Sequence, residues 1–259
     1  MFTQAGYVGK SKLDFPEFGV ARGTPWRSVE GTGREQGPEL GAASEPRCRG
    51  RAGGAACGVL QTKRAGEMLF SQGDRADGAY EVVRGMLRLY KMLPDGRRQI
   101  TGFVSTGELV GVTPNGARPY TAEAVTDLVL CRFPPAAFDR MIDEQPGFAR
   151  RLLSATADDL DAAQEQMLLL GRMTAVEKVV SFLLVLAKRQ GGVLARFVDL
   201  PMGRNDIADY LGLTIETVSR TLSRLKQAGS IGLPTPTRVE IRDIRRLEML
   251  AHDGAAAAA

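Results

Sequence analysis

The hydrophobic pattern of this 259-residue chain changes its period once, and the change limits the folds open to the chain. Before Pro134-Pro135, short runs alternate between apolar and polar residues, which is the period of strands with one buried face. After it, apolar residues recur every three or four positions, which is the period of amphipathic helices. A chain that separates its strands from its helices in this way is predicted to be α+β.

The first patterned region spans residues 59–133 and is predicted to be an all-β domain. Glycines recur about every ten residues, a spacing typical of an antiparallel roll or barrel. Pro94-Asp-Gly96 indicates a hairpin turn, because proline presets φ and glycine supplies a positive φ. The predicted strands are Glu67–Phe70, Ala79–Val83, Gly85–Met92, Arg98–Val104, Thr121–Val125 and Leu128–Phe133.

Residues 134–171 are predicted to be a helical linker. A short helix over Ala136–Glu144 should end before Pro146. After it, a narrow apolar stripe repeats every seven residues over three heptads. The stripe fits either an amphipathic helix packed on its own domain or the seam of a two-stranded coiled coil. The residues expected at a dimer seam are Leu153, Leu160, Met167 and Leu170.

Residues 172–250 are predicted to be a winged helix-turn-helix domain. Ile207, Ala208 and Leu211 give a first helix its buried face, and Gly212 allows a sharp turn. Thr214 is a suitable N-cap for a second helix. A hairpin predicted after residue 230 would form the wing.

The second helix carries polar side chains whose spacing suits DNA. Glu216, Ser219 and Arg220 share one face of its first two turns, where a recognition helix meets base edges. Arginine can contact guanine in a bidentate manner, and glutamate can accept from cytosine. The alternative is a Glu–Arg helix pair on a solvated face. The residues expected at DNA are Thr214, Glu216, Thr217, Ser219, Arg220 and Arg224.

Composition excludes several other functions. The single histidine, His252, leaves no basis for a histidine metal site or a Ser-His-Asp triad, so no enzyme is predicted. No run of 18 apolar residues occurs, and the start lacks a secretory signal, so a cytoplasmic protein without a membrane partner is expected. The formal charge of +4 permits a nucleic-acid partner. Three cysteines argue against a disulfide framework.

These features together resemble the CRP/FNR family of bacterial transcription regulators, over about residues 59–250. The most specific part is Ile215–Leu222, whose Glu216, Ser219 and Arg220 are similar to the FixK and FNR branches. The cyclic-AMP receptor branch has arginine in place of Ile215 and glycine in place of Ser219. The resemblance implies a cyclic-nucleotide-binding-like β-roll, a dimerisation helix and a homodimer on a TTGAT-N4-ATCAA palindrome. It also implies RNA polymerase as a partner and a role in oxygen-responsive or nitrogen-fixation gene control.

The resemblance raises the question of an effector. Gly107-Glu-Leu109 and Arg118 lie where cyclic-nucleotide binders of the family hold the ligand, but Pro119 removes an N–H that a phosphate would use. A four-thiolate iron–sulfur cluster cannot form from Cys48, Cys57 and Cys131. We therefore expect no cofactor and no metal. The alternative is a sensor of the same family gated by a cyclic nucleotide or by cysteine oxidation.

The two ends of the chain carry no assigned function. Residues 1–58 are glycine-rich and lack a sustained period, which predicts a disordered leader. Residues 251–259, which end in five alanines, are predicted to be a tail.

Overall fold

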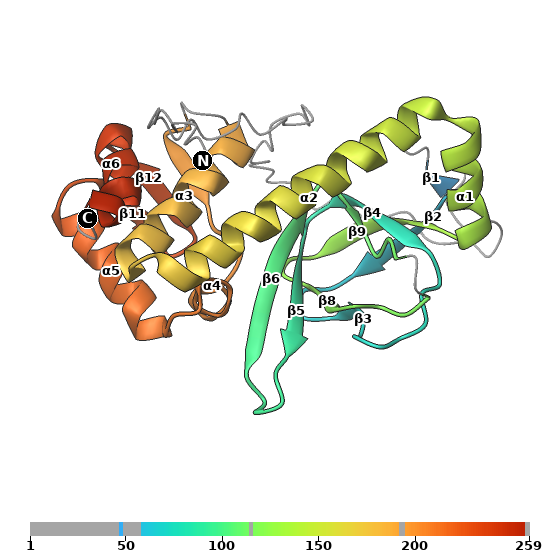
Figure 1. Ribbon diagram of the computed structural model, residues 1–259, viewed down its shortest axis with the longest axis horizontal. Helices are drawn as coiled ribbons and strands as arrows, with labels where there is room; N and C mark the ends of the chain where they lie inside the picture. The colour runs from blue at the N-terminus through green and yellow to red at the C-terminus, as the bar shows by residue number, and fades with distance from the viewer. Residues whose placement is uncertain (1–46, 49–57, 114–115, 192–194, 257–259) are drawn as a thin grey trace, which may run out of the picture.

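The computed structural model describes residues 47–48, 58–113, 116–191 and 195–256. The leader predicted for residues 1–58 lies almost wholly outside these ranges. The described chain is mixed α+β, as predicted, with a β-rich N-terminal half and a C-terminal half in which helices predominate (Figure 1).

The N-terminal half is a β-roll of two antiparallel sheets. One sheet has the strand order β1-β2-β9-β4-β7, and the other has the order β3-β8-β5-β6. Side chains that are almost fully buried, such as Val82, Leu87 and Leu130, lie between them. The strands are β1 (Arg47–Cys48), β2 (Gly58–Lys63), β3 (Met68–Phe70), β4 (Ala79–Arg84), β5 (Met86–Met92), β6 (Arg98–Ser105), β7 (Leu109–Val110), β8 (Thr121–Ala124) and β9 (Leu128–Phe133).

The predicted hairpin forms at the expected place. Strands β5 and β6 pair from Met86 opposite Ser105 to Met92 opposite Arg98. Gly96 in the turn has a φ of 83°, a backbone conformation that glycine adopts without steric cost. This long hairpin extends to the half of the molecule that contains the remaining helices.

Two helices connect the halves. Helix α1 (Pro135–Glu144) ends as predicted, and Pro146 then occupies the first position of α2 (Pro146–Arg172). Proline is tolerated there because the first N–H groups of a helix have no intrahelical partner. At 27 residues, α2 is about 40 Å long at 1.5 Å per residue, and it runs past both halves in Figure 1.

The C-terminal half combines helices with a three-stranded sheet of order β10-β12-β11. Helix α6 was not predicted, and it continues to Ala256 into the segment expected to be a tail. Leu247 and Ala251 of α6 are buried in the domain core, which explains the continuation. The elements are α3 (Ala175–Gly191), β10 (Phe197–Asp199), α4 (Arg204–Leu211), α5 (Ile215–Gln227), β11 (Ile231–Thr235), β12 (Arg238–Ile241) and α6 (Ile244–Ala256).

Cys131 forms a disulfide bond that the cysteine count did not predict. Its side chain is buried in β9, as a small apolar residue would be. Cys48 and Cys57 lie outside the residues whose side chains are described. Within the described ranges, no three metal-ligating side chains gather as a cation site would require. No described helix has the length and apolarity needed to cross a membrane.

Candidate nucleic-acid interface

Helices α4 and α5 form a helix-turn-helix through the residues predicted for it. Ile207, Ala208 and Leu211 of α4 are buried, as are Val218 and Leu222 of α5. The two helices therefore share one core and move as a unit.

The turn between these helices depends on Gly212. This residue ends α4 in the left-handed conformation, with a φ of 61°. The N–H of Leu213 then donates to the carbonyl of Ala208 at 3.0 Å. A Cβ atom at position 212 would lie 3.0 Å from Cδ2 of Leu170 on α2. Glycine therefore suits this position both for its backbone conformation and for its packing on α2.

The N-terminus of α5 is capped as predicted. The Oγ1 of Thr214 accepts a hydrogen bond from the N–H of Thr217 at 3.3 Å. Glu216 lies in the first turn of α5, where free N–H groups favour an anion. Hydrogen bonds from its own backbone and from Thr214, together with the charge of Arg220, lower the pKa of the Glu216 carboxyl. Glu216 is therefore an ionised acceptor at neutral pH.

The residues predicted to contact DNA lie on an accessible face. Glu216, Ser219, Arg220 and Arg224 are exposed, whereas Thr217 is half-buried and contacts Thr214. Glu216 and Arg220, both of which are described, form no direct ion pair, although the Arg220 charge acts on the Glu216 carboxyl. The alternative of a Glu–Arg pair on a solvated face therefore stays open. The face presents an acceptor and donors side by side, as base recognition needs.

Arg204, at the start of α4, is a basic residue that the sequence analysis missed. Its Nη2 donates to the carbonyl of Pro236 in the turn between β11 and β12 at 3.0 Å. Its Nη1 has no hydrogen-bond partner in the described part of the chain, and burial lowers the pKa of the guanidinium. Arg204 therefore links the helix-turn-helix to the wing, with Nη2 hydrogen-bonded and Nη1 buried. Its position at a helix N-terminus was the signal in the sequence.

Three of the four predicted seam residues are exposed along α2. Leu153 is 72% exposed, Leu160 is 59% exposed and Met167 is 66% exposed. Leu170 differs, since it is half-buried and packs against the core of the C-terminal half near Gly212. A stripe of large exposed apolar residues on one helix is typical of an interaction surface.

In the β-roll, the residues considered for effector binding are hydrogen-bonded to other groups of the same domain. The buried Arg118 guanidinium donates to Oδ1 of Asp77 at 2.7 Å, to the carbonyl of Gly78 at 2.8 Å and to the carbonyl of Gly111. Its Cζ lies 4.2 Å from the centre of the Phe70 ring. Glu108 accepts hydrogen bonds from the N–H and the hydroxyl of Ser105. The charged groups that a cyclic nucleotide would need are thus already used within the chain.

Comparison with known proteins agrees with this architecture. Residues 60–145 match the cyclic nucleotide-binding domain family, and residues 177–250 match the Crp-like helix-turn-helix domain family. The nitrogen fixation regulation protein FixK of Bradyrhizobium diazoefficiens is 43% identical over 189 residues, covering 72% of this chain and 79% of the relative. The transcriptional activatory protein AadR of Rhodopseudomonas palustris is 43% identical over 189 residues, covering 71% of this chain and 78% of the relative.

A solved structure extends the likeness to three dimensions. The structure of FixK2 from Bradyrhizobium japonicum aligns with a TM-score of 0.70 at 37% identity, covering 74% of this chain and 96% of that one. The relatives are transcription regulators rather than enzymes. Both the domain order and these relatives agree with the features found in the sequence. The chain belongs to the CRP/FNR family of DNA-binding transcription regulators, on its FixK- and FNR-like side.

Proposed function

We propose that this protein is a homodimeric transcription activator that binds a TTGAT-N4-ATCAA-like palindrome through α5. The observation that carries the proposal is the exposed face of α5, where Glu216, Ser219 and Arg220 lie together within two turns. Arg220 is suited to guanine and Glu216 to cytosine. Arg224 and Lys226, which are exposed on α5, supply contacts to the phosphate backbone, which add affinity without sequence preference.

The homodimer rests on α2. Leu153, Leu160 and Met167 would be buried against the same residues of a second copy, in the heptad register of a two-stranded coiled coil. A two-fold dimer presents its two recognition helices to two half-sites about one helical turn apart, as a palindrome requires. Leu170 contributes by fixing the end of α2 to the helix-turn-helix rather than by lying in the seam.

Activity without a bound effector is the second part of the proposal. Both terminal nitrogens of Arg118 donate hydrogen bonds, Nη1 to Gly111 and Nη2 to Asp77 and Gly78. Its Nε has no partner in the described part of the chain. A cyclic phosphate would have to displace the Asp77 carboxylate, which is already a charge-assisted partner. The regulator is therefore controlled by its abundance or by an upstream protein.

One observation favours the alternative of a redox-gated sensor. Cys131 is disulfide-bonded, and reduction of a buried disulfide would change the packing of β9 in the β-roll. The two proposals differ in what they predict for protein purified in air and for protein kept reduced.

The biological setting is proposed from the relatives. The names of FixK and AadR describe a nitrogen fixation regulation protein and a transcriptional activatory protein. We place this chain in oxygen-responsive or nitrogen-fixation gene control, in the cytoplasm, with RNA polymerase as its partner on DNA.

The test is a titration of the purified protein against a labelled TTGAT-N4-ATCAA duplex, with a scrambled duplex at the same salt as control. We expect the affinity for the palindrome to exceed that for the scrambled duplex by about 10³-fold, which is at the low end for specific regulators. The affinity should not change with added cyclic AMP or between air and anaerobic reduction. Equal affinity for both duplexes would refute the proposed recognition, and binding only after reduction would support the redox-gated alternative.

A further inference from the structure

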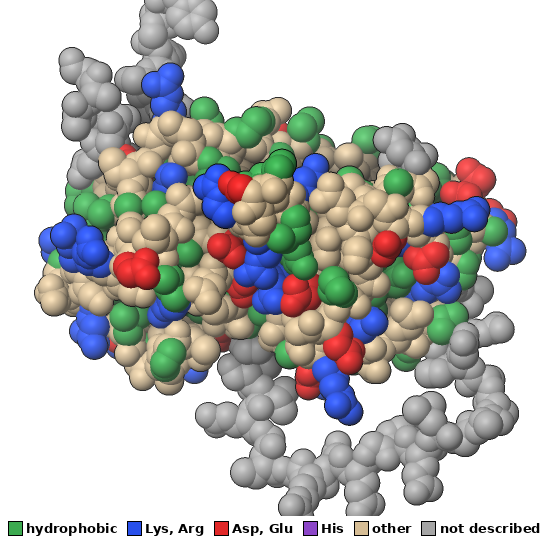
Figure 2. All heavy atoms as spheres, turned by 90° about the horizontal axis from the view of Figure 1, so that it is seen from below, with side chains coloured by type: hydrophobic (Ala, Val, Ile, Leu, Met, Phe, Trp, Pro, Cys, Tyr) green, Lys and Arg blue, Asp and Glu red, His purple; other side chains and the backbone are tan. Residues whose placement is uncertain are grey.

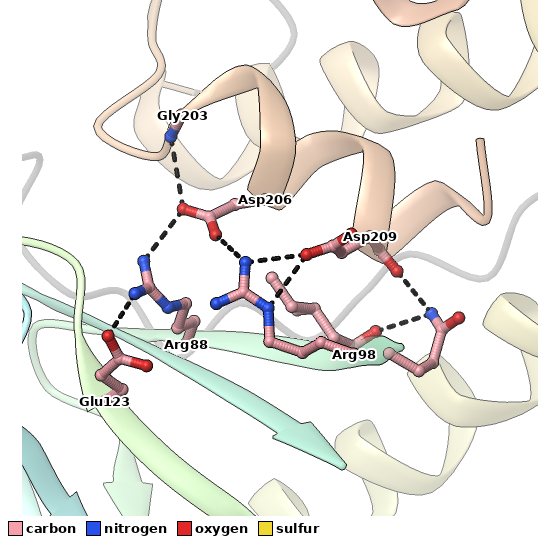
Figure 3. Close-up of polar contacts among 8 residues, drawn as sticks. Arg88, Arg98, Glu123, Gly203, Asp206 and Asp209 are labelled. Carbon is pink, nitrogen blue, oxygen red and sulfur yellow. Dashed lines mark hydrogen bonds and ion pairs between the residues drawn. The ribbon is translucent and has the colours of Figure 1, made fainter. Parts of the chain in front are cut away.

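A group of five charged side chains joins the β-roll to the first helix of the helix-turn-helix. Figure 3 shows the arginines of the β5–β6 hairpin reaching two carboxylates of α4. Arg98 Nη2 lies 2.8 Å from Oδ1 of Asp206 and 2.7 Å from Oδ2 of Asp209, and Arg88 Nη1 lies 3.1 Å from Oδ2 of Asp206. Arg88 also pairs with Glu123 of β8. The α4 ion cluster, as we name it, consists of Arg88, Arg98, Glu123, Asp206 and Asp209.

The cluster is partly shielded from water, which strengthens it. The Asp206 side chain is 8% exposed and that of Arg88 is 16% exposed, whereas Arg98 is 24% and Asp209 is 32% exposed. Partly buried charged hydrogen bonds are stronger than surface ion pairs, and the loss of one partner leaves a buried charge unpaired. Figure 2 shows side chains of both charges adjoining in the middle of the face seen from below.

The cluster does more than cap a helix. Asp206 does accept a hydrogen bond from the N–H of Gly203 at 3.4 Å, as a residue near a helix N-terminus can. A cap, however, needs no arginines from a sheet that lies more than 100 residues earlier in the sequence. The neighbouring Gln99 donates from Nε2 to the carbonyl of Asp209 at 2.7 Å, so the hairpin also holds the backbone of α4.

Holding α4 also holds the recognition helix. Because α4 and α5 share one core, the hairpin that fixes α4 fixes the direction of α5 relative to the β-roll and α2. In this arrangement the DNA-contacting face of α5 and the seam residues of α2 are both exposed. A conformation that leaves both surfaces free is compatible with a dimer on DNA.

We propose that the α4 ion cluster presets the orientation of the DNA-binding domain, with Arg98 and Asp209 as positioning residues for recognition of the palindrome. This inference rests on the proposed function of dimeric DNA binding. A domain tethered only through the end of α2 would sample many orientations, and the apparent affinity would fall with the fraction that suits both half-sites. The cluster raises that fraction in the absence of any ligand.

The test uses Arg98→Gln, Asp209→Asn and the double variant of the full-length protein. Arg97→Gln is the matched control, because Arg97 is the next residue, its side chain is 77% exposed, and it forms its ion pair with Asp95 in the same turn. Each variant is titrated against the full palindrome and against a duplex with a single half-site. Hydrogen exchange of α4 and of β5–β6 is measured without DNA.

We expect each cluster variant to lose about 10-fold in affinity for the palindrome and little for the half-site, since one half-site does not require two fixed orientations. The double variant should bind the palindrome no more weakly than the weaker-binding single variant, because each single change already breaks the Arg98–Asp209 pair. Exchange should rise in α4 and β6, and Arg97→Gln should match the wild type.

Three outcomes would overturn the inference. Equal losses on the palindrome and the half-site would mean damage to the helix-turn-helix itself, and tighter binding to the palindrome would mean that the contact is inhibitory. Unchanged affinity and exchange would mean that the cluster does not position the domain. A wild-type protein that does not prefer the palindrome would refute the proposed function, while the exchange measurement would still test the cluster.

Discussion

At the scale of single residues, we expect sequence recognition to depend on Arg220. Its side chain is exposed on α5 and has no ion pair with Glu216, so its donors are available to a base. We expect Arg220→Ala to lose about 1–3 kcal/mol of binding free energy on the palindrome and to relax specificity at one base pair. Titration against single-base variants of the duplex measures both effects. Arg245→Ala removes the same charge from the exposed side of α6 and should retain specificity. If Arg220→Ala kept the affinity and the specificity of the wild type, Arg220 would take no part in recognition.

A second residue-scale prediction concerns Asp77 and the stability of the β-roll. Partial burial opposes ionisation of Asp77, but hydrogen bonds from Tyr80 and Arg118 and the charge of Arg132 outweigh it, so its pKa is lowered from 3.8. A lowered pKa in the folded state contributes stability above the unfolded pKa, and this contribution is lost as the pH falls through the folded value. Asp77→Asn should therefore destabilise the protein at pH 7 by about 1 kcal/mol.

Urea unfolding of the wild type and of Asp77→Asn at several pH values measures this effect. The difference between the two proteins should shrink as the pH falls below about 4, because protonated aspartic acid and asparagine are then both neutral. Asp139→Asn makes the same chemical change at an exposed position of α1 and serves as the control. A constant difference at every pH would contradict the assigned role of the Asp77 charge.

At the scale of elements, the turn between α4 and α5 depends on one glycine. Gly212→Ala would place a side chain in the left-handed conformation and 3.0 Å from Leu170, so we expect a loss of about 1–2 kcal/mol in the free energy of unfolding. Gly203→Ala is the control, since a Cβ there meets no atom within 4 Å. Thermal unfolding of both variants checks the prediction, and equal stability would mean that the turn tolerates a side chain.

The seam of α2 gives the other prediction at this scale. Leu160→Glu would place a charge in the centre of a coiled-coil interface, where no partner compensates for its desolvation, and should leave a monomer. Leu168→Glu is the matched control, because Leu168 is 63% exposed on the same helix but lies outside the heptad stripe. Light scattering after size exclusion measures both masses. If Leu160→Glu remains dimeric, the dimer forms through another surface.

At the scale of the whole molecule, the sequence pattern predicted structural features that depend on neighbouring residues. It did not predict contacts between residues that are distant in the chain. Strands, helices, the hairpin and the turn at Gly212 follow from local period and backbone preference. No pattern in the sequence indicated a role for Asp206 and Asp209, because their partners Arg88 and Arg98 lie more than 100 residues away. Helix α6 was missed although Ile244, Leu247 and Ala251 follow a helical period.

The same distant contacts predict that the two halves unfold together. Beside the α4 ion cluster, the Phe103 ring of β6 lies 5.5 Å from the Tyr210 ring of α4, which lies 5.6 Å from Phe182 of α3. Phe103→Ala removes the aromatic contact and should weaken the interface by about 1–3 kcal/mol. In calorimetry, the wild type should unfold in one transition and the variant in two.

The control for this coupling lies at the other edge of the same sheet. Met68 of β3 is 53% exposed, and β3 lies at the opposite edge of the sheet from β6, so Met68→Ala removes an apolar side chain without touching the contact with α4. The ratio of calorimetric to van't Hoff enthalpy should stay near the wild-type value in Met68→Ala and rise in Phe103→Ala. If Phe103→Ala keeps a single transition with an unchanged ratio, the aromatic contact does not couple the halves. The coupling would then rest on the α4 ion cluster and on the end of α2, and Arg98→Gln in the same measurement would separate these two.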